Sequence, residues 1–516
     1  MSSGRPTKRR RTTAGGIGAP SEADTPSAQA NAPSSAAYST RRVVTNVHTL
    51  SSLCIDVFAA SFHMFSSDTN IWQPNSRWEK TRELLKLVPD STIPRLLAAL
   101  MASHPNLLSS DLLRDNFLRG SALLLSSDLG GGMNKNVIAA VPLMGSSLIS
   151  LSLYNFDKIE DVGFEKVVSK LPHLQSLNLR GCSRVGPRTL SSAAKHCGAL
   201  DSLNLNYTSV TPVQLAPFLN ARKDALRVLK VAIPTWTDAL FAKLQSELHM
   251  DTFKMTALQT LKLRQTSLSD VSLNAILACC PHIRRLDLSF TRVKTLSPVS
   301  LESMTGLEKS SLTSTDVPKN HLIKILQHAQ GLRTLNIGAM GGGRGQSVGL
   351  GNASALTMTD DVLVAVTKAI GSCVTALNLV GNAKIGQRRQ PILDLLESMR
   401  ERVKVLNLTG LTALRSSDLA ALEEEGGAPA LEVLSLSRTN IDDIAAPYIA
   451  ACPSLRVLDV AATRMTSDGL YTIISACPSL AQLDLTKCRS VPLGARRSIF
   501  EEWEKARDAD DGSEHE

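Results

Sequence analysis

The stretch Leu431–Leu485 reads LEVLSLSRTNIDDIAAPYIAACP, then SLRVLDVAATRMTSDGLYTIISACP, then SLAQLDL. Its two complete units, of 24 and 25 residues, share the pattern L-x-x-L-x-[LV], a polar turn, a helical segment and Ala-Cys-Pro. Leu434 and Leu436 alternate with Val433 and Ser435, which is the period-two pattern of a strand with one buried face. The later part of each unit carries apolar residues at helical spacing. The stretch therefore predicts repeated units of one short strand followed by one helix.

The same pattern can be followed along most of the chain. Its leading apolar residue recurs at steps of 26, 26, 26, 32, 25, 24, 25, 42, 29, 28, 24 and 25 residues. These leading residues are Leu148, Leu174, Leu200, Leu226, Leu258, Ile283, Leu307, Leu332, Val374, Val403, Leu431, Leu455 and Leu480. Residues 121–127, SALLLSS, predict an imperfect first strand. A strand and helix of this length bury their apolar faces only by stacking on neighbouring units.

The predicted fold class is α/β, a right-handed leucine-rich-repeat solenoid. Parallel strands are expected on the concave side of a horseshoe and helices on the convex side. The repeats occupy residues 121–500, and a small helical module precedes them at residues 45–120. Residues 1–44 are rich in Ser, Ala, Thr, Pro and Gly without apolar periodicity, so we expect a disordered basic tail. Residues 501–516 form a predicted acidic C-terminal tail.

A basic cluster near the start of the chain suggests where the protein works. It consists of Lys8, Arg9, Arg10 and Arg11. Such a cluster is typical of a nuclear import signal or of a nucleic-acid contact, and a merely solvated tail is the plain alternative. We therefore expect the protein in the nucleus and the cytoplasm.

Several classes of protein are disfavoured by what the sequence lacks. It has no run of 18 apolar residues and no apolar segment at its start, so we expect neither a membrane span nor a secretory signal. The nine cysteines are an odd, scattered set, which favours reduced thiols inside the cell.

Motifs of catalysis are also missing. No G-x-S-x-G, H-E-x-x-H or kinase motif is present. The glycine-rich insertion Gly338–Ser354 is not followed by the Gly-Lys-[Ser/Thr] of a phosphate-binding loop, so we expect a flexible loop there. The chain is predicted to be no enzyme, with no cofactor and no metal.

The concave face is the expected recognition surface, because residues between and after the strand leucines point to that side. The cations at these positions gather in the first half of the array: Arg180, Lys230, Lys262, Arg264, Arg285 and Lys309. With strands about 4.8 Å apart, they would form a stripe roughly 25 Å long. Like charges repel unless an acidic partner arrives, so the stripe suits an acidic or phosphorylated substrate segment. Cations scattered by chance over a solvated face are the alternative. Nucleic acid is a less favoured ligand, because the strands offer no exposed aromatic series.

The first predicted helix resembles a known docking element. Thr49-Leu50-x3-Cys54-x3-Phe58 resembles the elongin C-binding box, small–Leu–x3–Cys–x3–aliphatic, with Phe58 in place of a smaller aliphatic residue. The later segment VPDSTIPRLLAAL resembles the Pro-containing segment after that box in substrate receptors of cullin ubiquitin ligases. The resemblance implies that Leu50, Cys54 and Phe58 contact a ligase adaptor such as elongin C or an SCF adaptor. A helical cap on the first repeat is the alternative.

The repeats are similar to the cysteine-containing, RNI-like leucine-rich-repeat family of F-box and related substrate receptors, and to fungal excision-repair proteins. The cysteines that carry the similarity are Cys182 and Cys488 in turns, and Cys279, Cys452 and Cys477 near helix ends. The resemblance implies a substrate-recognition subunit of a cullin-type ubiquitin ligase that acts by proximity. The alternative is a nuclear leucine-rich-repeat scaffold, or a DNA-repair or chromatin factor, without a ligase role. A GTPase-activating repeat protein fits less well, because the repeat length and turn pattern differ.

Overall fold

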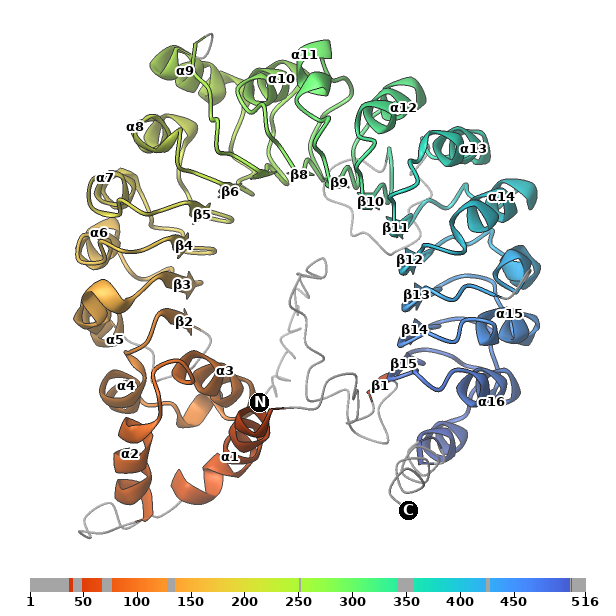
Figure 1. The fold of residues 1–516 in the computed structure, drawn as a ribbon, viewed down its shortest axis with the longest axis horizontal. Helices are drawn as coiled ribbons and strands as arrows, with labels where there is room; N and C mark the ends of the chain where they lie inside the picture. Colours follow the sequence, from red (N-terminus) through yellow and green to blue (C-terminus); the bar gives the residue numbers. More distant parts are fainter. Residues whose placement is uncertain are drawn as a thin grey trace, which may run out of the picture.

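The protein forms a horseshoe whose inner face is one sheet and whose outer face is a row of helices (Figure 1). The computed structural model describes residues 37–39, 49–66, 77–127, 135–249, 252–341, 357–423, 427–501 and 503. A small bundle of helices precedes the parallel strands of the repeats, as the sequence predicts. The α/β solenoid predicted from the repeats is therefore confirmed.

Strands β2 to β15 are parallel and lie in the sheet in chain order. Their bounds are β2 Ala122–Ser126, β3 Ser150–Tyr154, β4 Ser176–Asn178, β5 Ser202–Asn204, β6 Val228–Lys230, β7 Thr260–Lys262, β8 Arg285–Asp287, β9 Lys309–Ser311, β10 Thr334–Asn336, β11 Ala376–Asn378, β12 Val405–Asn407, β13 Val433–Ser435, β14 Val457–Asp459 and β15 Gln482–Asp484. Strand β2 is the imperfect first strand expected at residues 121–127, and β3 to β15 correspond to the thirteen predicted repeats.

The convex side carries one or two helical segments between successive strands. The segments are α5 Lys135–Ala140, η5 Val141–Ser147, α6 Asp161–Val168, α7 Pro187–His196, α8 Pro212–Arg222, α9 Asp238–Leu248, α10 Asp270–Ala278, α11 Pro298–Glu302, α12 Lys319–His328, α13 Asp360–Ala369, α14 Gln390–Met399, η6 Ser416–Leu422, η8 Asp443–Ala445, α15 Ala446–Ala450 and α16 Ser467–Ala476. Their apolar faces and the strand leucines form one continuous core. All thirteen leading residues of the repeats are at most 1% exposed.

In more than half of the repeats, one small polar side chain holds the turn after the strand. Thr208 donates from Oγ1 to the carbonyl oxygen of Leu205 at 2.9 Å, and threonines in five later repeats repeat this bond. Cys182 and Cys488 occupy the same place, and their thiols bond carbonyl oxygens of the preceding repeat. Burial raises the pKa of Cys182 to about 12, so its thiol stays protonated. These cysteines act as packing and hydrogen-bonding groups rather than as nucleophiles.

The N-terminal bundle consists of α1 Leu50–Ser66, α2 Arg77–Leu87, α3 Ile93–Ser103, η2 Pro105–Leu107, α4 Ser110–Leu112 and η3 Leu113–Phe117. Helix α2 ends before Pro89 and α3 ends before Pro105, because proline cannot continue a helix. Phe62 and Phe117 are fully buried and join the core of the first repeats. The bundle therefore caps the apolar end of the solenoid.

The other end of the sheet is covered by two elements. Strand β1, Ala37–Ser39, pairs antiparallel with β15 and lies within the segment predicted as a tail. Residues 493–501 are helical and, with Trp503, place Phe500 and Trp503 against the core at 1% and 4% exposure. Trp503 falls within the segment predicted as acidic tail, and its burial helps to cover the last repeat. The rest of both tails lies outside the described residues.

Candidate functional site

Each strand of the horseshoe presents three inward positions in a common register. In β5 they are Ser202, Asn204 and Asn206, which we call the first, third and fifth positions. The pairing continues without a shift, so that Ser202 faces Val228 and Asn204 faces Lys230 on β6. Side chains at one position therefore form a column across the concave face.

The third position has a structural role in half of the array. An Asn or Asp there accepts a hydrogen bond at Oδ1 from the backbone N–H two residues later, at 2.8–3.2 Å. These residues are Asn178, Asn204, Asp287, Asn378, Asn407, Asp459 and Asp484. The bond is a local turn stabiliser of the Asx type. Polar residues in this column are thus mostly part of the scaffold.

Lys230 and Lys262 break this rule on neighbouring strands. They occupy the third positions of β6 and β7 and face each other in register. A lysine ammonium has no acceptor, so neither residue can stabilise its turn as Asn or Asp does. Two like charges also stand side by side, which is unfavourable in a sheet. Residues that break the local rule of a scaffold are expected at functional sites.

Three further predicted cations lie beside this pair. Arg285 and Lys309 face each other at the first positions of β8 and β9. Arg264 follows Lys262 on the same face, at the fifth position after β7. Five of the six predicted cations are therefore brought together over β6 to β9. Arg180 lies apart, at the fifth position after β4 and three strands from Arg264 in the same column.

Two arginines of the concave face lie over aromatic rings that the sequence did not single out. The guanidinium of Arg180 lies 5.5 Å from the ring centre of Tyr207, and that of Arg264 lies 4.8 Å from that of Phe290. Tyr207 also donates from its hydroxyl to Oε1 of Gln265 at 3.0 Å. Tyr207, Gln265 and Phe290 all have positive φ and follow the fifth position of their strands. Aligning the repeats one residue further would have revealed them.

The concave face thus carries more aromatic surface than the strands alone predict. Tyr207 is 41% exposed and Phe290 is half-buried. Both rings already have an arginine against them, which holds that arginine in place by cation–π attraction. The rings of Tyr207 and Phe290 therefore orient Arg180 and Arg264.

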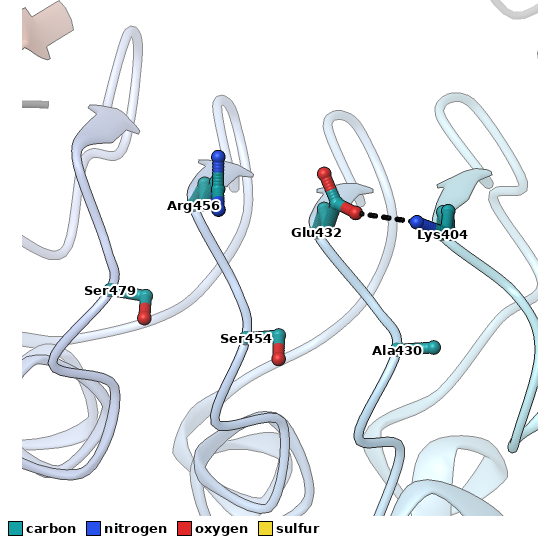
Figure 2. Close-up of a pocket in the computed structure, with 6 residues that line it drawn as sticks. All are labelled: Lys404, Ala430, Glu432, Ser454, Arg456 and Ser479. Carbon is teal, nitrogen blue, oxygen red and sulfur yellow. Dashed lines mark hydrogen bonds and ion pairs between the residues drawn. The ribbon is translucent and has the colours of Figure 1, made fainter. Parts of the chain in front are cut away.

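A second charged column runs just before the strands, on the rim of the sheet. Arg284 and Glu308 pair at 2.7 Å there, and Lys404 and Glu432 pair at 3.1 Å. Figure 2 shows a polar pocket of about 230 Å³ on this rim. Its lining residues are Lys404, Ala430, Glu432, Ser454, Arg456 and Ser479. Because cations and acids alternate here, the rim has less net charge than the face over β6 to β9.

The far end of the concave face is acidic. Asp459 and Asp484 face each other in register at the third positions of β14 and β15. Burial, together with the neighbouring carboxylate of Asp484, raises the pKa of Asp459 to about 6, although the Ala461 N–H and Arg438 act the other way. The horseshoe therefore has a basic first half and an acidic last repeat.

Helix α1 places the residues of the predicted adaptor-binding box. Leu50 is 77% exposed and Cys54 is also exposed. Phe58 differs, because it is half-buried and its ring lies 5.7 Å from the rings of both Phe62 and Phe65. Phe58 therefore contributes to the inside of the bundle.

The outer face of α1 is instead completed by residues that the sequence pattern did not select. Leu53, Val57 and Met64 are 47%, 66% and 55% exposed. With Leu50 and Cys54 they follow helical spacing, so they form one apolar stripe, which we call the α1 stripe. Ile55, Ala59 and Phe62 line the opposite, buried face. The helix is thus apolar on both sides.

Metal sites, membrane spans and reactive cysteines have less support in the described residues than the concave face and α1 do. Within the described ranges, no group of three or more His, Cys, Asp and Glu side chains is arranged to hold a metal ion. Among those same residues, no helix is both long enough and apolar enough to span a bilayer. Burial raises the pKa of Cys280, which keeps this thiol protonated. The basic cluster Lys8–Arg11 and most of the insertion Gly338–Ser354 lie outside the described residues.

Comparisons with known proteins find similar solved structures but no matching family. No family model matches the sequence, and no curated protein matches it. A chain of the yeast complex of Rad7 and Elc1 is 19% identical with a TM-score of 0.43, over 82% of this chain and 95% of that one. A leucine-rich-repeat protein of Leptospira interrogans is 15% identical with a TM-score of 0.36, over 76% and 88%. TLR13 in complex with the RNA ssRNA13 is 16% identical with a TM-score of 0.32, over 78% and 60%. These are similarities of low identity and low TM-score, and the leucine-rich-repeat fold of this chain rests on its own repeats and parallel sheet.

Proposed function

We propose that this protein is the substrate-recognition subunit of a cullin-type ubiquitin ligase. In this proposal the α1 stripe binds an adaptor of the elongin C or SCF type, and the concave face over β6 to β9 captures the substrate. The protein performs no bond chemistry. It raises the effective concentration of a substrate lysine near a ubiquitin-charged enzyme.

The observation that carries the proposal is the α1 stripe. A helix that buries one face normally turns a polar face to solvent. Helix α1 buries Ile55 and Phe62 yet leaves Leu50 and Val57 at 77% and 66% exposure on its other side. Contiguous exposed apolar residues of this kind mark sites where a partner binds. Apolar anchors at helical spacing fit the mode in which a helix enters a groove of its partner.

The helix is also held firmly enough to carry a partner. Phe62 packs edge-on against Trp78 of α2 with ring centres 5.8 Å apart. Arg95 of α3 donates to the hydroxyl of Ser52 on α1, and α3 in turn packs against β2. An adaptor on α1 would therefore sit at one end of the horseshoe, at a fixed position relative to the concave face (Figure 1).

A binding experiment with purified elongin C tests the adaptor step. We expect the full chain to co-purify with elongin C, and the variant Leu50→Asp/Cys54→Asp to lose this binding. The matched control is Leu143→Asp, because Leu143 is an equally exposed leucine, at 77%, on another element. Binding of the control should equal that of the wild type.

The same experiment has two other informative results. Binding to an SCF adaptor in place of elongin C would keep the ligase role and change the adaptor. Absence of binding to both adaptors, with the concave face still capturing its ligand, would remove the ligase role. The chain would then be a leucine-rich-repeat scaffold or a repair factor. The cluster Lys8–Arg11 supports work in the nucleus as well as in the cytoplasm under either reading.

A further inference from the structure

We infer that the concave face over β6 to β9 recognises an extended acidic peptide segment with two anionic groups three or four residues apart and uncharged residues between them. Each group is a phosphoryl group or a pair of carboxylates. This inference rests on the proposed substrate capture and adds the pattern that is read. It depends on the placement of two cation pairs and of one acid between them.

The first cation pair is Lys230 and Lys262, in register on β6 and β7. Neighbouring strands are about 4.8 Å apart, so an anion placed above the two strands can reach both ammonium groups. Arg264 lies two residues beyond Lys262 on the same face. The three side chains together make the more strongly charged of the two subsites.

Arg264 is prepared to donate to a ligand. Its guanidinium lies 4.8 Å from the centre of the Phe290 ring, which orients the plane of the group. Among the described residues, the buried atoms Nε of Arg264 and Oδ1 of Asn206 have no hydrogen-bond partner. A buried polar atom without a partner is costly and is a common mark of a site that a ligand or water completes.

The second cation pair is Arg285 and Lys309, in register at the first positions of β8 and β9. Glu308, the acid beside Lys309 in sequence, pairs with Arg284 on the rim at 2.7 Å. Arg285 is exposed on the concave face. The pair therefore forms a second place where an anion meets two cations.

Asp287 separates the two pairs. It stands at the third position of β8, next to Lys262 in register and two residues after Arg285 on its own strand. One of its carboxylate oxygens accepts the N–H of Ser289 at 3.0 Å, which keeps the side chain in place. A ligand with a continuous row of negative charge would be repelled by this carboxylate. A ligand with two separate anions avoids the repulsion if the residues between the anions are uncharged.

The sheet geometry sets the spacing of the two anions. The centres of the pairs are two strands apart across the sheet and two residues apart along it. With about 4.8 Å per strand and about 3.3 Å per residue, the separation is about 12 Å. An extended peptide covers this distance in three or four residues. A nucleic acid is less suited, because its regularly spaced phosphates would bring charge close to Asp287.

Synthetic peptides test the inference directly. We would label Gly/Ser/Ala peptides that carry two phosphoserines, adjacent, about four residues apart, or about eight residues apart. Their binding to the full chain would be followed by fluorescence anisotropy at physiological salt. We expect the middle spacing to bind about tenfold or more tightly than either other spacing, because only it engages both pairs. Equal affinity at all three spacings would overturn the inference.

A variant of the first pair tests whether that pair binds one of the two anions. Lys230→Gln/Lys262→Gln should reduce the affinity for the doubly phosphorylated peptide to that for a singly phosphorylated one. The matched control is Lys319→Gln/Lys324→Gln, which removes the same charge from the exposed side of the convex helix α12. Control affinity should be unchanged. A loss of equal size in both variants would show general attraction between charges and would overturn the inference.

Two further measurements separate this inference from nucleic-acid binding and from the proposed ligase role. A single-stranded oligouridylate that binds more tightly than every peptide would make the face a nucleic-acid surface and overturn the peptide reading. Leu50→Asp/Cys54→Asp should bind the peptides as the wild type does. If that variant and the wild type both fail to bind an adaptor but keep the spacing preference, the ligase role fails and the inference stands.

Discussion

Lys230 and Lys262 stand side by side on β6 and β7, at a position where seven other strands use Asn or Asp to stabilise the following turn. Two costs meet at this point, because a turn-stabilising bond cannot form and two lysines stand opposite each other on neighbouring strands. The solenoid thus gives up local stability where the ligand is proposed to bind. A trade of this kind between stability and function is common at binding sites.

Restoring the turn bond should reveal this cost. Lys230→Asn should raise the free energy of unfolding by about 1 kcal/mol, through a new turn bond and less repulsion. The same variant should weaken binding of the doubly phosphorylated peptide. Urea denaturation and anisotropy measure the two effects. The reverse change, Asn407→Lys, removes an observed bond to the N–H of Thr409 and should destabilise by a similar amount. A stabilised variant with full affinity would contradict the assignment of Lys230.

Charge reversal at the arginines should have a larger effect on binding. Arg264→Glu/Arg285→Glu places acids in both subsites and should weaken peptide capture by about two orders of magnitude, less in high salt. The fold should be preserved, because both side chains reach the concave surface. Ser435→Glu on β13 is the control. Asn407, its neighbour in the same column, is unsuitable because it stabilises its own turn. If Ser435→Glu harms capture more than the arginine variant does, the ligand binds elsewhere on the horseshoe.

On α1, Val57 and Phe58 should respond differently to substitution. Val57→Asp should abolish adaptor binding and leave the thermal unfolding temperature nearly unchanged, because Val57 is 66% exposed. Phe58→Ala should instead lower the stability of the bundle by about 2 kcal/mol, because its ring packs against Phe62 and Phe65. Co-purification and thermal denaturation of the two variants distinguish these roles. Loss of folding in Val57→Asp would show that the α1 stripe supports the bundle itself.

The raised pKa of Asp459 predicts a dependence of stability on pH. The ordinary value is 3.8 and the folded value is about 6, so between them the folded chain holds a proton that the unfolded chain loses. Stability from this group therefore falls as the pH rises from about 4 to about 6, and the loss is complete above that range.

Asp459→Asn keeps the oxygen that accepts the Ala461 N–H and removes the charge. This variant should be more stable than the wild type by about 1–2 kcal/mol at pH 7 and equally stable near pH 4. Urea denaturation across this range measures the difference. Asp484→Asn should have a smaller effect, because burial of Asp459 is the largest cause of its shift. A difference independent of pH would exclude the ionisation of Asp459 as its source.

The location of the protein can be tested with its first residues alone. A fluorescent reporter fused to residues 1–44 should concentrate in the nucleus of transfected cells. Replacing Lys8, Arg9, Arg10 and Arg11 with Ala should disperse it. An even distribution of the unaltered reporter would remove the argument for nuclear import.

Much of the fold could be predicted because each repeat carries the sequence signals for its own strand and helix. The leucines of Leu431–Leu485 and their period-two spacing are local signals, and neighbouring units stack in the same register. That register also places Arg285 beside Lys309, so most of the basic stripe was predictable. The dividing role of Asp287 was not, because it depends on which neighbouring side chain lies across the sheet.

The exposed side of α1 could be predicted only in part, and the adaptor-binding role of its residues stays a prediction. Leu50 and Cys54 are exposed as a docking residue must be, but the short pattern could not tell Phe58 from Val57. Which side of a helix is buried depends on the helices packed against it, here α2 and α3. Tyr207 and Phe290 were missed because they follow the strands at positive φ, outside the strand pattern.

The antiparallel pairing of β1 with β15 has a mechanical consequence. Ser39 is bonded at the last repeat, and Thr49 lies ten residues later at the start of the N-terminal bundle, so the chain between them spans at most about 35 Å. While β1 stays paired, the two ends of the horseshoe are tethered and cannot spread beyond that reach. A bulky ligand that pushes the two ends further apart would first have to break the pairing of the three-residue strand β1 with β15. The three residue pairs between β1 and β15 therefore limit how far the two ends of the horseshoe can separate.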